Sequence, residues 1–246
     1  MVKSFRSPSK IARRLKLMPL AARKLTSWPR FMYNYALGLV PDAPYAFRNR
    51  ARLKIGRGVD HVPIIEIFLR EDYGVVSDGA VVLDLGANIG LTALHYSAMW
   101  PEACVCAVEM DQENFDMCVR NFPGVSIHAA VGVRAGAGYY AQEGWEARYS
   151  LTRPGDTFVR VLTIGQIIDE CLPTASGIFC KMDIEGAEWD IFAGGGIDAR
   201  ITHLLVELHG PDIPKEEVKR GKRMLANSGF ETTRHVIHPS ALWAVR

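Results

Sequence analysis

From residue 81 to the C-terminus, short apolar runs alternate with longer segments whose apolar residues recur at the spacing of a helix face. The runs predict strands at 81–85, 104–108, 125–129, 158–161, 178–182 and 201–207. The segments between them predict helices at 90–99, 111–121, 163–171, 186–193 and 214–228. Two further strands, near 230–236 and 241–245, are close enough in sequence to pair as an antiparallel hairpin at one edge. The alternation predicts an α/β fold with a doubly wound, mostly parallel, seven-stranded sheet.

Two sections depart from this alternation. Before the first strand, an amphipathic helix is predicted to begin near Pro63, and its inward face carries Ile64, Ile67 and Phe68. Between 132 and 158 the chain is rich in glycine and aromatic residues, and the stretch from 139 to 158 is predicted to be irregular. This second section either closes over a bound molecule or forms a surface excursion. It contains Trp145, Arg148, Tyr149 and Arg153.

Size and composition indicate one globular domain with an appendage. The chain has 246 residues, 48% of them hydrophobic, and no apolar run approaches the length of roughly 18–20 residues that a membrane span needs. The five cysteines are odd in number and show no zinc-binding spacing. They are typical of reduced residues in a cytoplasmic protein, which is the location that we expect.

The first 41 residues differ from the rest in charge. They contain nine lysines or arginines and no acid, whereas the other 20 basic and 27 acidic residues give 42–246 a net charge of −7. Apolar residues recur in this arm at helical spacing, namely Ile11, Leu15, Met18, Ala22 and Leu25. The sequence therefore predicts a basic helical extension at 1–41 and a domain at 42–246. The extension packs on the core or on a partner subunit, lies on an anionic membrane surface, or is a processed targeting segment.

A ligand-binding turn is predicted where the first strand ends. Asp84 is followed by Gly86, Ala87, Asn88 and Gly90, and a helix then begins, which is how a parallel strand delivers a small ligand to a helix N-terminus. The third glycine of a dinucleotide loop is missing, and an acid in this place would repel a pyrophosphate. It suits a ligand with an ammonium group, as in the methionine part of S-adenosylmethionine.

The next strand ends in a second acid. Glu109 follows Gly90 by 19 residues, the usual distance to a carboxylate that accepts hydrogen bonds from ribose hydroxyls. Together the two acids predict that S-adenosylmethionine binds here. By position alone, Met110 and Ala130 are the candidates to lie against its adenine.

Acidic residues and a histidine follow two later strands. Asp183, Glu185 and Glu188 occupy six residues, and carboxylates so close together repel one another unless a cation or hydrogen bonds intervene. We expect Asp183 to position the acceptor of the methyl group, to act as a base or to bind a divalent cation. Glu185 is a further catalytic candidate, whereas Glu188 is read as a helix cap. Glu207 and His209 end the following strand, and His209 is a candidate general base. Asp183, Glu207 and His209 are the candidate ligands of the cation.

From Leu53 onward the chain resembles the FkbM family of class I methyltransferases. The resemblance rests on Arg57-Gly-Val-Asp60 with Glu66-Ile-Phe and Tyr73, on Asp84-Leu-Gly-Ala-Asn-Ile-Gly90, on Lys181-Met-Asp-Ile-Glu-Gly-Ala-Glu188 and on Leu205-Val-Glu-Leu-His209. It implies a Rossmann-like sheet and an S-adenosylmethionine-dependent enzyme that methylates a hydroxyl of a small molecule, sugar or natural product, with no nucleic acid as partner. The alternatives are an N- or carboxyl-methyltransferase on a peptide or lipid-linked acceptor, and a module that binds the cofactor without catalysis.

Overall fold

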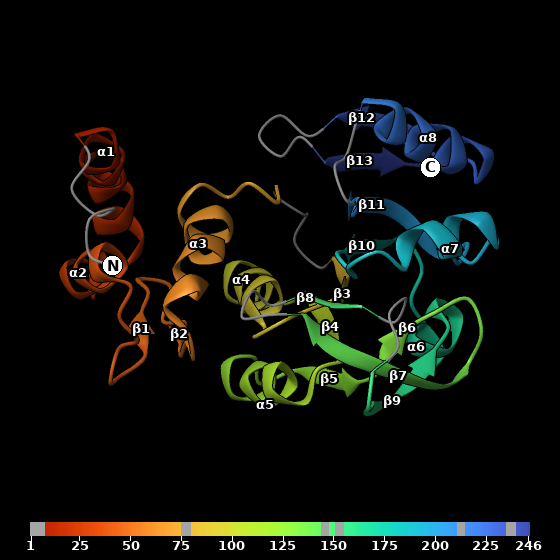
Figure 1. The fold of residues 1–246 in the computed structure, drawn as a ribbon, viewed down its shortest axis with the longest axis horizontal. Coiled ribbons are helices and arrows are strands. Elements are labelled where there is room, and N and C mark those ends of the chain that lie inside the picture. Colours follow the sequence, from red (N-terminus) through yellow and green to blue (C-terminus); the bar gives the residue numbers. More distant parts are fainter. Residues whose placement is uncertain (1–7, 75–79, 144–147, 151–154, 211–214, 235–239) are drawn as a thin grey trace.

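The computed structural model describes residues 8–74, 80–143, 148–150, 155–210, 215–234 and 240–246 (Figure 1). At its centre is a seven-stranded sheet in the order β12-β13-β11-β10-β3-β4-β5. All neighbouring strands are parallel except at the edge, where β13 runs antiparallel to both β11 and β12. The strands are β3 (Val81–Leu85), β4 (Cys104–Glu109), β5 (Val125–His128), β10 (Ile178–Met182), β11 (Ile201–Glu207), β12 (Glu231–Arg234) and β13 (Ala241–Val245). The predicted doubly wound fold and its closing hairpin are confirmed.

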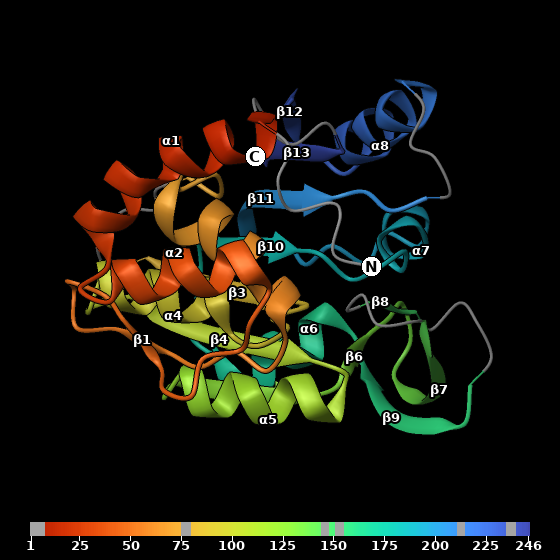
Figure 2. The same cartoon turned by 60° about the vertical axis from the view of Figure 1, so that its left-hand side comes forward.

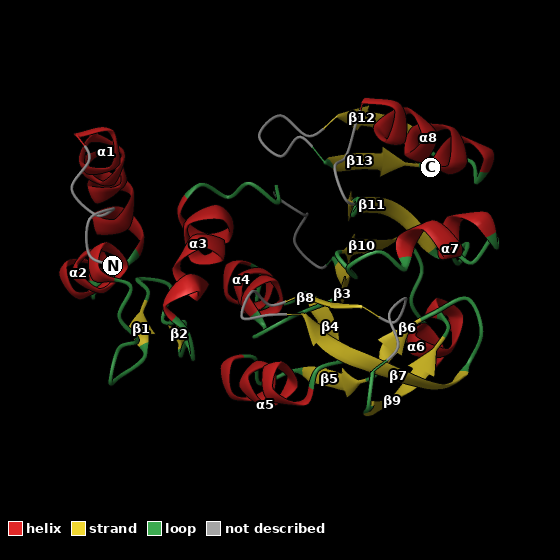
Figure 3. Cartoon of the chain, in the orientation of Figure 1, coloured by secondary structure: helices red, strands yellow, loops and turns green. Residues whose placement is uncertain are grey.

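Helices cover both faces of this sheet, which is why its central strands are continuous apolar runs rather than alternating ones. Alternate side chains of β3 enter two different cores, Leu83 and Leu85 on one face and Val82 on the other. The first core includes residues of α6 (Ile164–Cys171), α7 (Glu188–Ala193) and α8 (Lys215–Asn227). The second includes residues of α4 (Leu91–Met99) and α5 (Gln112–Asn121). Figure 3 shows the two helical layers on either side of the strands.

The described residues of the section from 132 to 158 are mostly strand, so the prediction of an irregular stretch at 139–158 is wrong for them. β6 (Ala130–Val131), β7 (Gly136–Glu143), β8 (Arg148–Ser150) and β9 (Thr157–Leu162) form a second sheet in the order β6-β9-β7-β8. The strand expected at 158–161 therefore belongs to this sheet and not to the central one. Its buried core is small, with Tyr140, Val159 and Val161, because the glycines and alanines of β7 contribute little apolar surface. Trp145 and Arg153 lie outside the described residues.

The basic arm is helical, as predicted, and it is packed against the domain. It contains α1 (Pro8–Lys24) and α2 (Trp28–Leu37), which lie at the left of Figure 1 and across the front of Figure 2. Side chains of both helices share a core with residues beyond 42, among them Leu17, Ala21, Phe31, Phe68 and Leu94. The Lys24 Nζ also lies 2.5 Å from the Glu71 Oε1. None of the described helices is long and apolar enough to cross a membrane.

The segment that joins the arm to the sheet forms part of the same core. A short hairpin of β1 (Tyr45–Ala46) and β2 (Arg52–Leu53) precedes the turn η1 (Gly58–Asp60), the helix α3 (His61–Ile64) and the π-helical turn η2 (Ile65–Leu69). The helical stretch therefore begins a few residues before Pro63. Its predicted inward face is confirmed, because Ile64, Ile67 and Phe68 are buried.

Candidate active site

Two adjoining pockets open where the strands of the central sheet end. The first holds about 580 Å³ of empty space and is lined by Gly86, Asn88, Val108, Glu109, Met110, Asn114, Val131, Asp183, Ile184, Glu185 and Ala187. The second, of about 1300 Å³, reaches from the same turn to α3, Tyr73 and the ends of β10 and β11. Gly86, Asn88, Asp183 and Glu185 line both pockets. A molecule in the first pocket is therefore next to a molecule in the second, at the edge where open α/β sheets bind ligands.

Gly86 lies where the turn after β3 contacts the end of β10. Its φ of +76° is a conformation that L side chains rarely adopt, and a Cβ at this position would lie 1.8 Å from the Asp183 carbonyl oxygen. The Gly86 and Ala87 amides both donate to the Val108 carbonyl at 2.9 Å, which ties the turn to β4. Gly90, with φ +80°, ends the turn at the start of α4 and packs against Cys118. The turn leaves no room for a side chain at Gly86, so no side chain covers the backbone at this position.

Glu109 is held by two backbone amides. Its Oε2 accepts a hydrogen bond from the Asn88 amide at 2.7 Å, and its Oε1 accepts one from the Asp111 amide at 2.8 Å. Burial raises the pKa of Glu109 to about 7, although both hydrogen bonds act in the opposite direction. Each carboxylate oxygen keeps a second lone pair, and the side chain lines the first pocket.

Lys181 lies between two carboxylates beside this turn. The parallel register of β10 and β3 places Lys181 next to Asp84, and its Nζ is 3.3 Å from the Asp84 Oδ1 and 3.5 Å from the Asp183 Oδ2. The same Nζ donates to the Gly86 carbonyl at 2.7 Å. Burial alone would lower the pKa of Lys181, but the two carboxylates raise it, so the ammonium form is held. Asp84 is fully buried in this pair and lines neither pocket.

His209 is held by a buried carboxylate from the helix before it. The Glu188 Oε1 accepts the His209 amide at 2.6 Å and lies 3.3 Å from the His209 Nδ1, while its Oε2 accepts the Gly186 amide at 2.8 Å. The expected cap is wrong, because the N-cap of α7 is Ala187 and no side chain caps the helix. Glu188 instead ties the Gly186 amide to His209 and orients the imidazole. Burial would lower the pKa of His209, but the hydrogen bond to Glu188 and the nearby carboxylates raise it to about 9.

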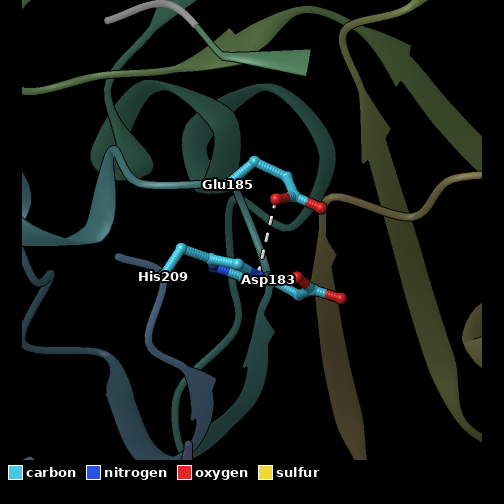
Figure 4. A group of neighbouring side chains, drawn as sticks. All are labelled: Asp183, Glu185 and His209. Carbon is cyan, nitrogen blue, oxygen red and sulfur yellow. Dashed lines mark ion pairs between the residues drawn. The ribbon is translucent and has the colours of Figure 1, made fainter. Parts of the chain in front are cut away.

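The other ring nitrogen of His209 faces Asp183 and Glu185, two carboxylates that line both pockets (Figure 4). Its Nε2 lies 3.4 Å from the Asp183 Oδ1 and 3.6 Å from the Glu185 Oε2. One donor atom from each of Asp183, Glu185 and His209 lies within 4.8 Å of the others, close enough for the three to share one cation. The residue at Glu185 has a φ of +56°, an uncommon conformation for a residue other than glycine, and this turn directs its side chain to the cluster.

Glu207 is not part of this group of three, although the sequence analysis placed it there in preference to Glu185. It lines the second pocket instead, together with Tyr73. Burial and the nearby Asp183 raise the pKa of Glu207 to about 7. Strand alternation places Glu207 and His209 on one side, but the β10–α7 turn brings Glu185 closer to the imidazole.

Most of the predicted residues line a pocket and four do not. Gly86, Ala87, Asn88, Glu109, Met110, Asp183 and Glu185 line at least one of the two pockets, whereas Asp84, Gly90, Ala130 and His209 line neither. The neighbour of Ala130, Val131, provides the wall at that point. Sequence reasoning missed Asn114, whose position in the first turn after the Glu109 strand was the available signal. It did not assign Lys181 to the site, because its position next to Asp84 depends on the parallel register of β10 and β3.

The strand order, the glycine turn after β3 and the buried acid at the end of β4 define a Rossmann-like methyltransferase. The chain belongs to the FkbM methyltransferase family, because the family's sequence profile, described as "Methyltransferase FkbM domain", matches residues 84–234, more than half of the chain. The protein is therefore an S-adenosylmethionine-dependent methyltransferase. A comparison with curated proteins finds no match.

Solved structures with a similar fold share little sequence. A putative transferase from Pyrococcus horikoshii is 14% identical, with a TM-score of 0.42 over 94% of this chain and 83% of that chain. Fibrillarin from Aeropyrum pernix, in complex with S-adenosyl-L-methionine, is 15% identical, with a TM-score of 0.40 over 68% and 66%. A predicted O-methyltransferase from Agrobacterium tumefaciens is 15% identical, with a TM-score of 0.40 over 71% and 77%. These similarities concern the fold, and we draw nothing further from them.

Proposed function

We propose that this methyltransferase transfers the methyl group of S-adenosylmethionine to a hydroxyl of a small molecule, sugar or natural product. The observation that carries the proposal is the position of Asp183 between the two pockets, with its side-chain oxygens next to two cationic groups, Lys181 and His209. A hydroxyl in the second pocket would meet this carboxylate next to the methyl donor. A hydroxyl acceptor loses its proton during methyl transfer, and an oriented carboxylate is one of the groups that can accept it.

The residues of the first pocket fit the cofactor. Glu109 has free lone pairs for the two ribose hydroxyls, and the bare backbone at Gly86, Ala87 and Asn88 suits the methionine part at the start of α4, which Gly90 opens. Met110 and Val131, next to Ala130, provide the apolar wall for the adenine. Asp84 would act on the methionine part through Lys181, which it fixes against the Gly86 carbonyl.

The main task of the protein in this reaction is to orient the acceptor relative to the methyl donor. S-adenosylmethionine supplies an electrophilic methyl group on a sulfonium, so the protein has to hold the acceptor oxygen in line with it. Asp183 accepts the hydroxyl proton as the oxygen attacks. His209 is protonated at neutral pH because its pKa is about 9, so it holds the Asp183 carboxylate in place rather than taking the proton itself. Glu185 shares the imidazole and lines both pockets.

A divalent cation is a second candidate for the role of holding Asp183. The observation that favours it is the group formed by Asp183, Glu185 and His209, in which Glu188 orients the imidazole from behind, as carboxylates do for metal-binding histidines. The cation would replace the proton on His209 and would be held by these three side chains. Titration of the protein with Mg²⁺ and Mn²⁺ by calorimetry, with the His209→Gln variant as control, decides between the cation and the protonated imidazole.

The function is tested with the full-length protein and methyl-labelled S-adenosylmethionine. Calorimetry is expected to show binding of the cofactor and of its demethylated product. A panel of sugars, glycosides and polyketide alcohols is then compared with amines, carboxylic acids and peptides, and label is expected only in hydroxyl acceptors. Transfer to amines or carboxylates alone would support the alternative class of N- or carboxyl-methyltransferase, and cofactor binding with no transfer to any acceptor would support a binding module.

A further inference from the structure

An exposed apolar patch lies at the end of α2. Tyr33, Leu37, Leu39 and Val40, which we call the α2 patch, are between 43% and 61% exposed. Tyr33 and Leu37 are four residues apart and share a face of the helix. Gly38 then ends the helix in the left-handed conformation, and the chain that follows exposes Leu39 and Val40. Elsewhere in the described residues, exposed large apolar side chains lie farther apart along the sequence, although Tyr139 and Phe158 contact each other.

The patch adjoins the segment that forms the rim of the second pocket. The Gly38 carbonyl packs directly against Gly58, because a Cβ on Gly58 would lie 2.3 Å from that oxygen. Four residues later Val62 is 48% exposed, and it lines the second pocket together with Pro63. The apolar surface at the end of α2 and the mouth of the pocket are thus connected through the contact of two glycines.

The arm that ends in the patch carries charges of one sign. Residues 1–41 contain nine lysines or arginines, and the first acidic residue of the chain is Asp42. Lys16 and Arg23 are exposed on α1, and Arg30 is exposed on α2, whose end carries the patch. Apolar side chains beside basic ones match a surface that is apolar inside and anionic at its boundary, which is a phospholipid membrane. A second copy of the chain would bring two strongly basic arms together, because a symmetric dimer joins identical surfaces.

We propose that α1, α2 and the α2 patch dock on an anionic phospholipid surface, with the patch inserted at the boundary and the mouth of the second pocket beside it. The docking itself is independent of the methyl-transfer reaction. One consequence rests on the proposed function: acceptor hydroxyls on lipid-linked molecules would reach the second pocket without leaving the membrane. The arm would then serve as a localisation element that also positions the pocket.

Sedimentation of the full-length protein with vesicles tests the docking. Vesicles of phosphatidylcholine alone are compared with vesicles that also contain phosphatidylglycerol, at low and high salt. Binding is expected only to the anionic vesicles and is expected to weaken with salt. The triple variant L37E/L39E/V40E should bind at least about tenfold more weakly. The matched control V119E/V125E replaces two valines that are equally exposed on α5 and β5 and should bind as the natural chain does.

Two further measurements keep the outcomes distinct. Cofactor affinity measured on each variant shows that the fold is intact, and its failure in the natural chain would count against the proposed function, not against docking. Lys16→Gln with Arg23→Gln should reduce vesicle binding while leaving cofactor affinity unchanged. Equal vesicle binding by the patch variant and the control overturns the proposal. So does the absence of binding to anionic vesicles. The proposal is also overturned if the natural chain and the control variant self-associate in solution and the patch variant does not, because the surface would then be a dimer interface.

Discussion

The two pockets are built by different means. Apart from Asp183 and Glu185, which it shares with the second pocket, the first pocket is lined by glycine, apolar and amide residues and by Glu109, which two backbone amides hold. The wall between it and the second pocket consists of charged side chains that hold one another. Asp183 lies between Lys181 and His209, and Glu188 holds His209. Backbone contacts fix a site with little dependence on distant residues, whereas a network of charged side chains can be adjusted by any of its members.

This difference matches the two ligands. A rigid turn suits a cofactor that stays the same. Side chains that can be replaced suit an acceptor that varies. The Gly86 turn connects the two systems, since its carbonyl accepts from Lys181 and its Cα faces the Asp183 carbonyl. We therefore expect three different effects. Substitutions in the first pocket should change cofactor affinity, and substitutions in the network should change turnover. A substitution at Gly86 should change both cofactor affinity and turnover.

The largest effect is expected for Gly86→Ala. The new Cβ would lie 1.8 Å from the Asp183 carbonyl oxygen, so β3 and β10 must separate at the site. We expect a loss of at least about 3 kcal/mol in the free energy of unfolding and no measurable cofactor binding. Urea denaturation and calorimetry measure the two quantities.

Gly229→Ala is the matched control for this substitution. Gly229 has a similar φ of +83°, but open space surrounds its Cβ position, so only the backbone strain of about 1 kcal/mol is expected. If Gly86→Ala cost no more than Gly229→Ala and bound the cofactor normally, the turn would not be the rigid joint between the pockets.

Asp183→Asn is expected to have the next largest effect, and it is confined to turnover. The amide keeps the shape but accepts a proton poorly, so kcat should fall by about 10²–10⁴ while cofactor affinity changes by less than about threefold. Steady-state kinetics with an acceptor from the panel and calorimetry with the cofactor separate the two. Asp169→Asn, which removes a carboxylate from a surface ion pair with Arg200, should change neither. A parallel loss of cofactor affinity in Asp183→Asn would mean that the two pockets are not built independently.

The same contrast explains what the sequence could predict. Gly86, Asn88 and Glu109 follow from local rules, because a turn after a buried strand and an acid at the end of the next one are features of a few consecutive residues. The central strands were equally visible, because strands buried on both faces are continuous apolar runs. β7 was missed because its Gly136-Ala-Gly start hides the alternation of a half-buried strand.

The network could be predicted only in part. Glu188 and His209 are 21 residues apart, and their contact depends on how β10, α7 and β11 are arranged in space. The positive φ of Glu185 directs its side chain to His209, and no spacing rule shows this. Lys181 and Asp84 are 97 residues apart, yet the parallel register makes them neighbours. Residue types at strand ends indicate which groups gather there, and the tertiary contacts decide which of them pair.

The pH dependence of stability tests whether the network holds His209 protonated. The pKa of His209 is about 9 in the folded protein, above its ordinary value of 6.5, so its contribution is fully present below pH 6.5 and is lost as the pH rises through 9. The free energy of unfolding should therefore fall between pH 7 and 9.5, by about 2–3 kcal/mol from this group. His209→Gln should remove that part of the slope in urea denaturation.

His203→Gln serves as the control, because this histidine is exposed at the start of β11 and outside the network. It should leave the slope unchanged. Glu188→Gln should reduce the slope, since a neutral amide stabilises the imidazolium less than a carboxylate does. A slope that persists in His209→Gln would assign it to other groups and would argue that the imidazole is neutral.

The smallest predicted effect concerns the first pocket, where pH should act on affinity rather than turnover. Burial raises the pKa of Glu109 in the free protein to about 7, and the ionised carboxylate is the better acceptor for ribose hydroxyls. Cofactor affinity should therefore rise about tenfold between pH 6 and pH 8, the change expected when one group with a pKa near 7 must lose its proton. Calorimetry over this range should show the rise in the natural chain and in Glu231→Gln, an exposed control on β12. Glu109→Gln should bind more weakly and without the rise. If it kept the same pH dependence, the charge that the cofactor senses would lie elsewhere, and the first pocket would depend on side-chain charge as the network does.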